Sequence, residues 1–314
     1  MKITIDDVAR KAKVSKTTVS RILNGNYEHT SEKTRQKVLK VIEELNYRPN
    51  PFAKGLKQLK SNVFGIVLSN LKNPFWIEVL EGVEDTFRKQ GYQLMICNSN
   101  EDAVLEADNI QSMLLRQVDG LLINPTARQT GIFHELMEKN YPFVVLNRKI
   151  PGIHTHAVLI DNKGGAALSV EHLLRLGKTK IAIFVFDLDH VSSWQERVLG
   201  YQEALLRNGF SEKDFIIYRV NTEEGSVRKE TVRMLKKSRK PDAILSTNNM
   251  MTLEILDGIR ECGLRIPNDI ALVSYDETVW AKHLDITTVQ HNGYEMGKAA
   301  AEKLIRQIGS ERKN

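Results

Sequence analysis

The stretch "TIDDVARKAKVSKTTVSRILNG" (residues 4–25) has the spacing of two short helices joined by a tight turn. Thr4, followed three residues later by Asp7, is a capping-box pattern and predicts a helix that begins after Thr4. The "AKVS" of residues 12–15 predicts the turn, with Ser15 placed to cap a second helix over residues 16–23. The "NGN" of residues 24–26 predicts the end of that helix, because Asn and Gly tolerate left-handed backbone.

A third helix is predicted to begin near Ser31 and to run through Leu45, which makes a helix-turn-helix braced by a third helix. The outward face of the second helix carries side chains that can pair with base edges in a major groove. These are Lys16, Thr17, Ser20 and Arg21. The alternative is a three-helix bundle with a solvated polar face, and the charge distribution argues against it.

The charge of the chain is concentrated in this first segment. Residues 1–60 contain 14 Lys and Arg against 6 Asp and Glu, a net of +8, whereas the whole chain of 314 residues has a net charge of +6. A basic head on a nearly neutral body indicates a module that binds a polyanion. The N-terminus lacks the apolar segment of a secretory signal, and no apolar run is long enough to span a bilayer.

From residue 63 onward, short apolar runs alternate with helical patterns. Continuous runs rich in β-branched residues are typical of strands buried on both faces of a parallel sheet. One series of runs covers residues 63–69, 93–99, 120–125 and 143–148, and a second covers 181–186, 215–220, 243–247 and 270–276. Two successive series predict two doubly wound lobes, each with its ligand-binding edge at the carboxyl ends of the strands.

Motifs of catalysis are missing from the sequence. We find no dinucleotide fingerprint, no phosphate-binding loop, no nucleophile elbow and no zinc-protease motif. The "HTH" of residues 154–156 has no further metal ligands nearby, and the "DLDH" of residues 187–190 has no nucleophile placed with it. We therefore expect a protein that is not an enzyme, with no cofactor and no metal.

The head resembles the DNA-binding segment of the lactose-repressor (LacI/GalR) family of bacterial regulators, and "EKTRQKVLKVIEELNYRPNPFAKGL" (residues 32–56) continues the likeness. The resemblance implies base contacts by Lys16, Thr17 and Arg21, with phosphate contacts and positioning by the other polar residues. It also implies a hinge helix whose leucine enters the minor groove as a wedge. The implied DNA-contacting residues are Thr4, Ser15, Lys16, Thr17, Thr18, Ser20, Arg21, Asn24, Asn50, Ala53, Lys54, Leu56 and Lys57.

The hinge stretch "RPNPFAKGLKQLKSN" (residues 48–62) combines linker-like prolines with one short amphipathic helical pattern. Gly55 weakens that helix from its middle, and isolated helices this short are unstable in water. We therefore hypothesise that the helix orders on DNA and that the effector controls its order.

The body is similar to the effector domain of the same family and to periplasmic sugar-binding proteins. Its matching segments include "NPFW" (73–76), "IDNKGGA" (160–166), "RVLGYQEAL" (197–205), "STNN" (246–249) and "VSYDET" (273–278). The likeness implies that Arg197, Asn248 and Asp276 bind the effector. Phe75 and Trp76 follow the first strand, where an aromatic ring can stack on a sugar, and Asn124 and Arg148 end later strands.

One position departs from the family pattern. Asn249 stands where an aspartate is common, which makes the predicted cleft less negative while it keeps Arg197 and adds Arg148. Since Arg pairs bidentately with carboxylates, we expect an anionic effector such as a sugar acid or a sugar phosphate rather than a neutral sugar.

The sequence thus predicts an all-α helix-turn-helix head (residues 1–47), a hinge helix or linker (48–61) and an effector-binding and dimerisation domain (62–314) of two parallel α/β lobes. The N-lobe is expected to cover about 62–160 plus a C-terminal return, and the C-lobe about 162–288. We expect a homodimeric transcriptional repressor of carbohydrate-metabolism genes, cytoplasmic and nucleoid-associated in a bacterium, that binds pseudo-palindromic double-stranded operator DNA. The alternatives are a solute-binding receptor of a transporter and a regulator controlled by a protein co-repressor.

Overall fold

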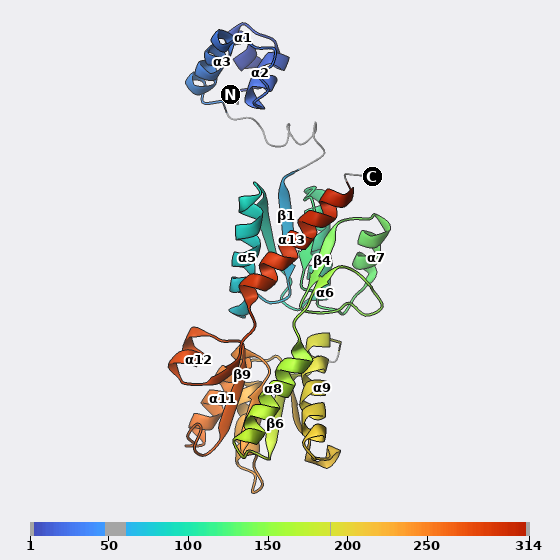
Figure 1. The fold of residues 1–314 in the computed structure, drawn as a ribbon, viewed down its shortest axis with the longest axis vertical. Coiled ribbons are helices and arrows are strands. Elements are labelled where there is room, and N and C mark those ends of the chain that lie inside the picture. Colours follow the sequence, from blue (N-terminus) through green and yellow to red (C-terminus); the bar gives the residue numbers. More distant parts are fainter. Residues whose placement is uncertain (1–2, 48–60, 189, 312–314) are drawn as a thin grey trace. The chain divides into compact units, whose positions relative to one another are not determined.

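The computed structural model describes residues 3–47, 61–188 and 190–311 (Figure 1). The chain divides into two compact units, Met1–Ser61 and Asn62–Asn314. The predicted hinge helix, including Asn50, Ala53, Lys54, Leu56 and Lys57, lies outside the described residues.

Residues 3–47 of the first unit form a bundle of three helices, as predicted. The helices are α1 (Ile5–Ala12), α2 (Lys16–Leu23) and α3 (Glu32–Glu44). The predicted N-caps Thr4 and Ser15 are confirmed, because each side chain accepts a hydrogen bond from a backbone N–H in the first turn. Ser31, near which the third helix was predicted to begin, caps α3 in the same way. The helices bury one shared core, in which the fully buried side chains are Val8, Ala12, Val19 and Val38. Local capping signals and apolar spacing therefore account for these three helices.

The N-lobe of the second unit is a parallel sheet of five strands in the order β2-β1-β3-β4-β5. The strands are β1 (Val63–Leu68), β2 (Gln93–Asn98), β3 (Leu121–Ile123), β4 (Phe143–Leu146) and β5 (Ala157–Val158). Helices α5 (Phe75–Lys89) and α13 (Gly293–Glu311) cover one face, and α6 (Ala103–Leu115) and α7 (Gly131–Glu138) cover the other (Figure 1).

The C-lobe repeats this plan with the order β10-β9-β8-β6-β7. Its strands are β6 (Ile181–Phe186), β7 (Ile216–Val220), β8 (Ala243–Ser246), β9 (Ala271–Tyr275) and β10 (Thr287–Val289). Helices α8 (Asn162–Arg175) and α9 (Ser192–Arg207) cover one face, and α10 (Ser226–Leu235), α11 (Asn249–Glu261) and α12 (Val279–His283) cover the other, with a 3₁₀ turn at Glu212–Asp214.

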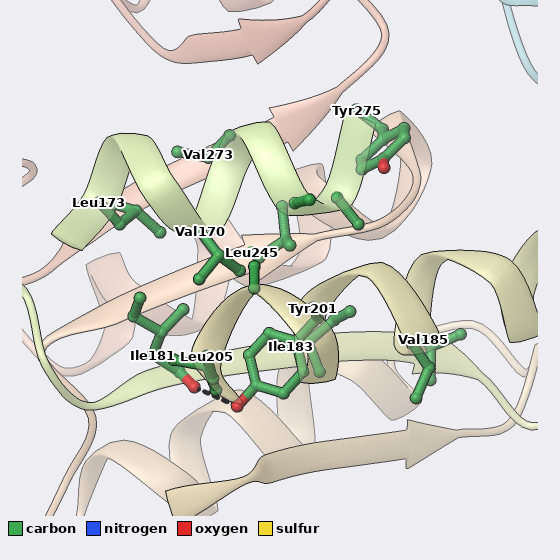
Figure 2. Close-up of a cluster of buried hydrophobic side chains, with 14 of the residues drawn as sticks. Val170, Leu173, Ile181, Ile183, Val185, Tyr201, Leu205, Leu245, Val273 and Tyr275 are labelled. Carbon is green, nitrogen blue, oxygen red and sulfur yellow. Dashed lines mark hydrogen bonds between the residues drawn. The ribbon is translucent and has the colours of Figure 1, made fainter. Parts of the chain in front are cut away.

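The core between the C-lobe sheet and its helices α8 and α9 is centred on Tyr201 (Figure 2). Its ring is fully buried, and its hydroxyl donates to the carbonyl of Ile181 at 2.7 Å and accepts from the backbone N–H of Ile216 at 2.9 Å. The hydroxyl thereby joins α9 to two neighbouring strands, so a polar atom is satisfied inside an apolar core.

Helix α13 completes the N-lobe from the far end of the sequence. It lies against α5 (Figure 1), and the two backbones approach each other at Gly82 and Gly297. A Cβ atom at Gly297 would overlap the carbonyl oxygen of Val79, and one at Gly82 would overlap that of Tyr294. Two glycines therefore set the separation of α5 and α13.

The predicted strands are confirmed in type, with two differences. The runs at residues 93–99 and 215–220 were expected to be buried on both faces, but β2 and β7 are edge strands whose side chains, apart from the buried Val220, are exposed or half-buried. Strands β5 and β10 were not predicted, because two or three residues are too short for a recognisable apolar run. Both close the opposite edge of their sheet.

Candidate functional site

The carboxyl ends of the two sheets face each other within the second unit. Asn73 follows β1 in the N-lobe, and its Oδ1 accepts from Nδ2 of Asn249, which follows β8 in the C-lobe, at 2.8 Å. Lys149 follows β4, and its Nζ lies 2.6 Å from Oε1 of Glu196 on α9. In each sheet the strand order reverses its direction between two neighbouring strands, β1 and β3 in the N-lobe and β6 and β8 in the C-lobe. Ligands of open α/β sheets bind at the carboxyl ends of the strands beside such a reversal. The region between the carboxyl ends of the two sheets, called the cleft below, is therefore the candidate ligand site.

Arg197 lies inside the C-lobe half of this cleft. It is 4% exposed; its Nε donates to Oδ1 of Asn162 at 2.9 Å, and its Nη1 donates to the carbonyl of Thr247. Its guanidinium carbon lies 4.0 Å from the centre of the Tyr275 ring and 4.9 Å from that of Trp194. Burial lowers the pKa of Arg197, because a charge removed from water is less stable.

Asn248 and Asp276 each end a strand of the same sheet. Oδ1 of Asn248 caps α11 by accepting from the backbone N–H groups of Met250 and Met251. Asp276 is 7% exposed and has a φ of 67°, a left-handed conformation that is uncommon outside glycine. Such backbone strain is typical of ligand sites.

Two residues bond to the Asp276 carboxylate, and neither was predicted to bind the effector. Nδ2 of Asn249 donates to its Oδ2 at 3.0 Å, and Nδ1 of His291 lies 3.1 Å from its Oδ1. The His291 ring packs against Tyr275 and faces Phe75 of the N-lobe, with ring centroids 5.1 and 6.2 Å away. His291 follows β10, where the chain passes from the C-lobe back to the N-lobe. Its position in this interlobe connection is the signal that could have identified it as a site residue.

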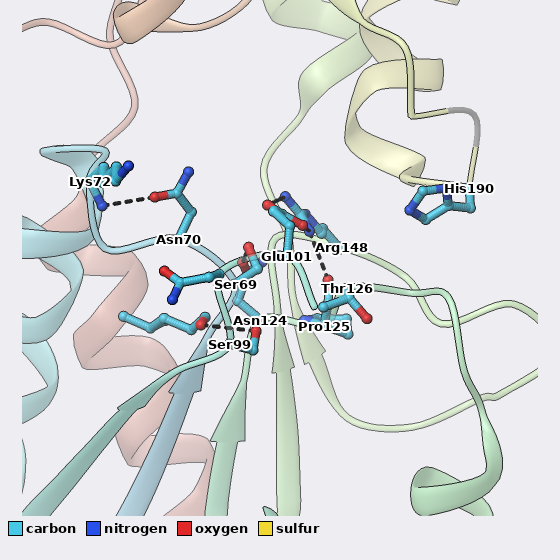
Figure 3. A network of polar contacts seen from close by, with 12 residues as sticks. Ser69, Asn70, Lys72, Ser99, Glu101, Asn124, Pro125, Thr126, Arg148 and His190 are labelled. Carbon is cyan, nitrogen blue, oxygen red and sulfur yellow. Dashed lines mark hydrogen bonds and ion pairs between the residues drawn. The ribbon is translucent and has the colours of Figure 1, made fainter. Parts of the chain in front are cut away.

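The N-lobe half of the cleft contains a polar network (Figure 3). Oδ1 of Asn124 accepts from the Ser69 hydroxyl at 2.6 Å, and its Nδ2 donates to the carbonyl of Leu146 at 2.9 Å. Arg148 forms a bidentate ion pair with Glu101 at 2.7 and 2.8 Å. Glu101 therefore neutralises the positive charge of Arg148, and the binding of an effector by Arg148 stays a prediction.

Phe75 and Trp76 begin α5 and are 6% and 4% exposed. Both belong to the N-lobe core, and their rings contact each other edge to face. The Phe75 ring also faces His291 across the cleft. The stacking of an effector on either ring stays a prediction.

Glu106 is a buried carboxylate beneath this network. It is 1% exposed and accepts hydrogen bonds from the backbone N–H and the hydroxyl of Thr126 at 2.7 and 3.0 Å. Burial raises the pKa of the Glu106 carboxyl from 4.5 to about 7, against the opposing effect of these two hydrogen bonds. The folded protein therefore holds a proton there that the unfolded chain has released, and it loses stability as the pH rises from 4.5 to 7.

We expect the pH dependence of folding to report this proton. Between pH 5.5 and 8, the free energy of unfolding should fall by about 2 kcal/mol more in the wild type than in Glu106→Gln, which cannot ionise. Urea unfolding at the two pH values measures the difference. The exposed Glu138→Gln is the control and should keep the wild-type slope; a wild-type slope in Glu106→Gln would contradict the buried proton.

In the helix-turn-helix unit, the predicted base-contacting residues Lys16, Thr17 and Arg21 are exposed on α2. Nζ of Lys16 lies 2.5 Å from Oδ1 of Asp6, an exposed ion pair that is worth little in water, so Lys16 can exchange it for a base or a phosphate. The face needed for reading a major groove is therefore available.

Other predicted DNA-contacting residues of α1 and α2 have structural partners. The Thr4 hydroxyl donates to Oδ2 of Asp7 at 2.7 Å, and the hydroxyls of Ser15 and Thr18 lie 2.9 Å apart. Ser20 is half-buried, and Asn24 is the exposed C-cap residue of α2. The contacts of these residues with DNA stay predictions.

Neither a metal nor a membrane site emerges from the described residues. No group of three or more His, Cys, Asp and Glu side chains within residues 3–47, 61–188 and 190–311 could hold a metal ion. No helix in that part of the chain is long and apolar enough to cross a membrane.

A helix-turn-helix unit followed by a two-lobed body with a polar interlobe cleft defines a ligand-controlled DNA-binding regulator. Comparison with known families agrees: residues 4–50 match "Bacterial regulatory proteins, lacI family", and residues 61–314 match "Periplasmic binding proteins and sugar binding domain of LacI family". The chain belongs to the LacI family of bacterial transcriptional regulators.

Individual relatives cover nearly the whole chain. It is 33% identical over 312 residues to the probable HTH-type transcriptional regulator EndR of Paenibacillus polymyxa. The match spans 98% of this chain and 91% of that protein. It is 32% identical to the HTH-type transcriptional regulator KdgR of Bacillus subtilis, with 97% and 91% covered. Both relatives are transcriptional regulators.

Solved structures confirm the predicted fold class. The lac repressor dimer bound to operator and the anti-inducer ONPF superposes with a TM-score of 0.87 at 26% identity, covering 99% of this chain and 94% of that one. The complex of the regulator CelR with cellobiose has a TM-score of 0.72 at 28% identity, covering 98% and 94%.

Proposed function

We propose that this regulator is a homodimeric repressor of carbohydrate-metabolism genes whose affinity for operator DNA is controlled by a small carbohydrate-derived effector. The observation that carries the proposal is the burial of three polar residues of the C-lobe, Arg197, Asn248 and Asp276, whose guanidinium, amide and carboxylate groups can pair with hydroxyl groups. The relatives bound to operator and to cellobiose support it.

We propose that the protein binds its effector and does not convert it into a product. Its relatives are regulators, and the cleft residues of the C-lobe are engaged with one another and with backbone groups rather than arranged as a nucleophile and base. Incubation with candidate sugars followed by product analysis tests this point, and turnover would refute it. We propose a bacterial, cytoplasmic site of action, in keeping with operator binding.

Operator binding is tested with the DNA upstream of the protein's own gene, by gel shift with and without carbohydrate mixtures. We expect specific binding with a Kd of about 10⁻⁸ M or lower at physiological salt and a change of affinity on addition of effector. Arg21→Ala should weaken specific binding roughly 10- to 100-fold, because a base contact is worth about 1–3 kcal/mol.

The matched control is Arg233→Ala, which removes an equally exposed arginine from α10 in the body. It should leave operator affinity unchanged. An equal loss of affinity by Arg21→Ala on operator and on unrelated DNA would contradict base reading by Arg21. No specific binding to any upstream DNA would contradict the proposed function itself.

A further inference from the structure

Three residues around Arg197 and Asp276 have a buried polar atom with no hydrogen-bond partner within the described part of the chain. They are Nε1 of Trp194, Oδ1 of Asn249 and Nε2 of His291. The three side chains are at least nine-tenths buried. Buried polar atoms are nearly always hydrogen-bonded in folded proteins, because an unpaired one costs about 1–3 kcal/mol. The grouping of these three unpaired atoms therefore indicates a ligand that forms hydrogen bonds with them.

The three atoms belong to one continuous cluster. The guanidinium of Arg197 contacts the rings of Trp194 and Tyr275, and the Tyr275 ring contacts His291. His291 is bonded to Asp276. Asn249 extends the cluster, since its Nδ2 bonds both Asp276 and, across the cleft, Asn73. The cluster therefore runs without interruption from Trp194 to Asn249.

The end of the cluster at Trp194 and Arg197 offers donors. An indole Nε1–H can only donate, and a guanidinium can only donate. Arg197 is bonded to the neutral oxygens of Asn162 and Thr247, and no ion pair joins it to a carboxylate among the residues that the structure describes. A buried cation without an anionic partner is costly. This end therefore favours a negatively charged oxygen acceptor.

The opposite end offers acceptors. The Asn249 amide donates through Nδ2 to Asn73 and to Asp276, which leaves its Oδ1 as an acceptor. The Asp276 carboxylate also accepts hydrogen bonds, and Nε2 of His291 is an unpaired ring nitrogen beside it. This end therefore favours hydroxyl donors.

We propose that the effector is a polyhydroxylated monocarboxylate, a sugar acid, bound with its carboxylate at Arg197 and Trp194 and its hydroxyls at Asp276, Asn249 and His291. The assignment rests on the proposed function and makes Trp194, Asn249 and His291 specificity-determining residues. The N-lobe half is already balanced, because Arg148 is paired with Glu101. One guanidinium whose direct hydrogen-bond partners are neutral oxygens matches a single carboxylate better than a phosphate ester, which carries close to two negative charges.

Isothermal titration of the full-length protein tests the ligand class. The probes are D-gluconate, D-galactonate, D-glucuronate and D-galacturonate, their parent hexoses, and glucose 6-phosphate and 6-phosphogluconate. We expect at least one acid to bind tenfold or more tightly than its parent hexose and than either phosphate, because hydrogen bonds to a charged group exceed those to a neutral one by about 1 kcal/mol each. The proposal is wrong if no acid binds more tightly than its parent.

Variants test the orientation. Trp194→Phe keeps a ring over Arg197 but removes the N–H, and it should weaken the acid about tenfold while it leaves the parent hexose unchanged. Trp280→Phe, in the C-lobe core against α11, is the matched control and should change neither affinity. Equal weakening of acid and hexose by Trp194→Phe would overturn the placement of the carboxylate.

His291 provides a second, independent test. His291→Gln can still donate to Asp276 and accept from a hydroxyl, so it should bind the acid better than His291→Phe, which keeps only the ring contacts with Phe75 and Tyr275. Equal affinities of the two variants would remove His291 from the site. Thermal unfolding of each variant verifies that it is folded.

Gel shifts with the same probes separate this proposal from the proposed function. Operator affinity that responds only to neutral hexoses would refute the sugar acid and leave effector control in place. Operator binding that responds to no probe, in a protein that also binds none, would refute both.

Discussion

Replacing Arg197 with methionine is expected to weaken effector binding at least 100-fold and to remove the effect of the effector on operator affinity. The Arg197 guanidinium is a permanent positive charge in the C-lobe cluster, and charged hydrogen bonds are worth about 1.5–3 kcal/mol each. Effector titration and gel shift measure the two losses.

The stability of the effector-free variant distinguishes a binding role from a structural one. Arg197→Met leaves the oxygens of Asn162 and Thr247 without their donor, but it also removes a buried charge. These costs oppose each other, so the free energy of unfolding should change by less than about 2 kcal/mol. Arg197→Lys should bind with intermediate affinity, because lysine keeps the positive charge but lacks the paired N–H donors of the planar guanidinium. Wild-type effector binding by Arg197→Met would contradict the site.

Replacing Gly297 with alanine is expected to lower the free energy of unfolding by about 3 kcal/mol, the upper end of the cost of overpacking. The added methyl group would overlap the Val79 carbonyl, so α13 would have to move away from α5 along their whole contact. Backbone atoms cannot change rotamer to make room, as a side chain could. Urea unfolding of the purified variant measures the loss.

The same substitution later in the same helix is the control. A Cβ at Gly309 meets no atom within 4 Å. Gly309→Ala should therefore keep the wild-type stability or gain up to about 1 kcal/mol from helix propensity. If both variants lost the same amount, close packing at Gly297 would not be the cause.

Local sequence signals predicted most of the fold. Capping at Thr4, Ser15 and Ser31 depends on residues within one turn, and a strand such as β6 is a continuous apolar run, so neighbouring residues suffice to identify both. The position of a strand at the edge of a sheet cannot be predicted in this way, because it depends on pairing with strands far away in the sequence, as for β2. The two-sided burial expected there was consequently wrong.

The site was predicted less completely, because its contacts join residues far apart in the chain. The bond between Asn73 and Asn249 spans 176 positions, and the partner of Arg148 lies 47 positions away at Glu101. The resemblance to a family identified Arg197, Asn248 and Asp276, but it could not show that Arg148 was neutralised. Trp194 and His291 belong to no motif, and only the fold brings them to Arg197 and Asp276.

The packing of α13 on α5 has a consequence for synthesis. The three helices of the head are contiguous and can fold as soon as they leave the ribosome, whereas the N-lobe lacks its last helix until the entire C-lobe has been made. At roughly 5–20 residues per second, about a quarter of a minute to a minute separates the two events. Each new molecule therefore acquires its DNA-reading unit first and its ligand control last.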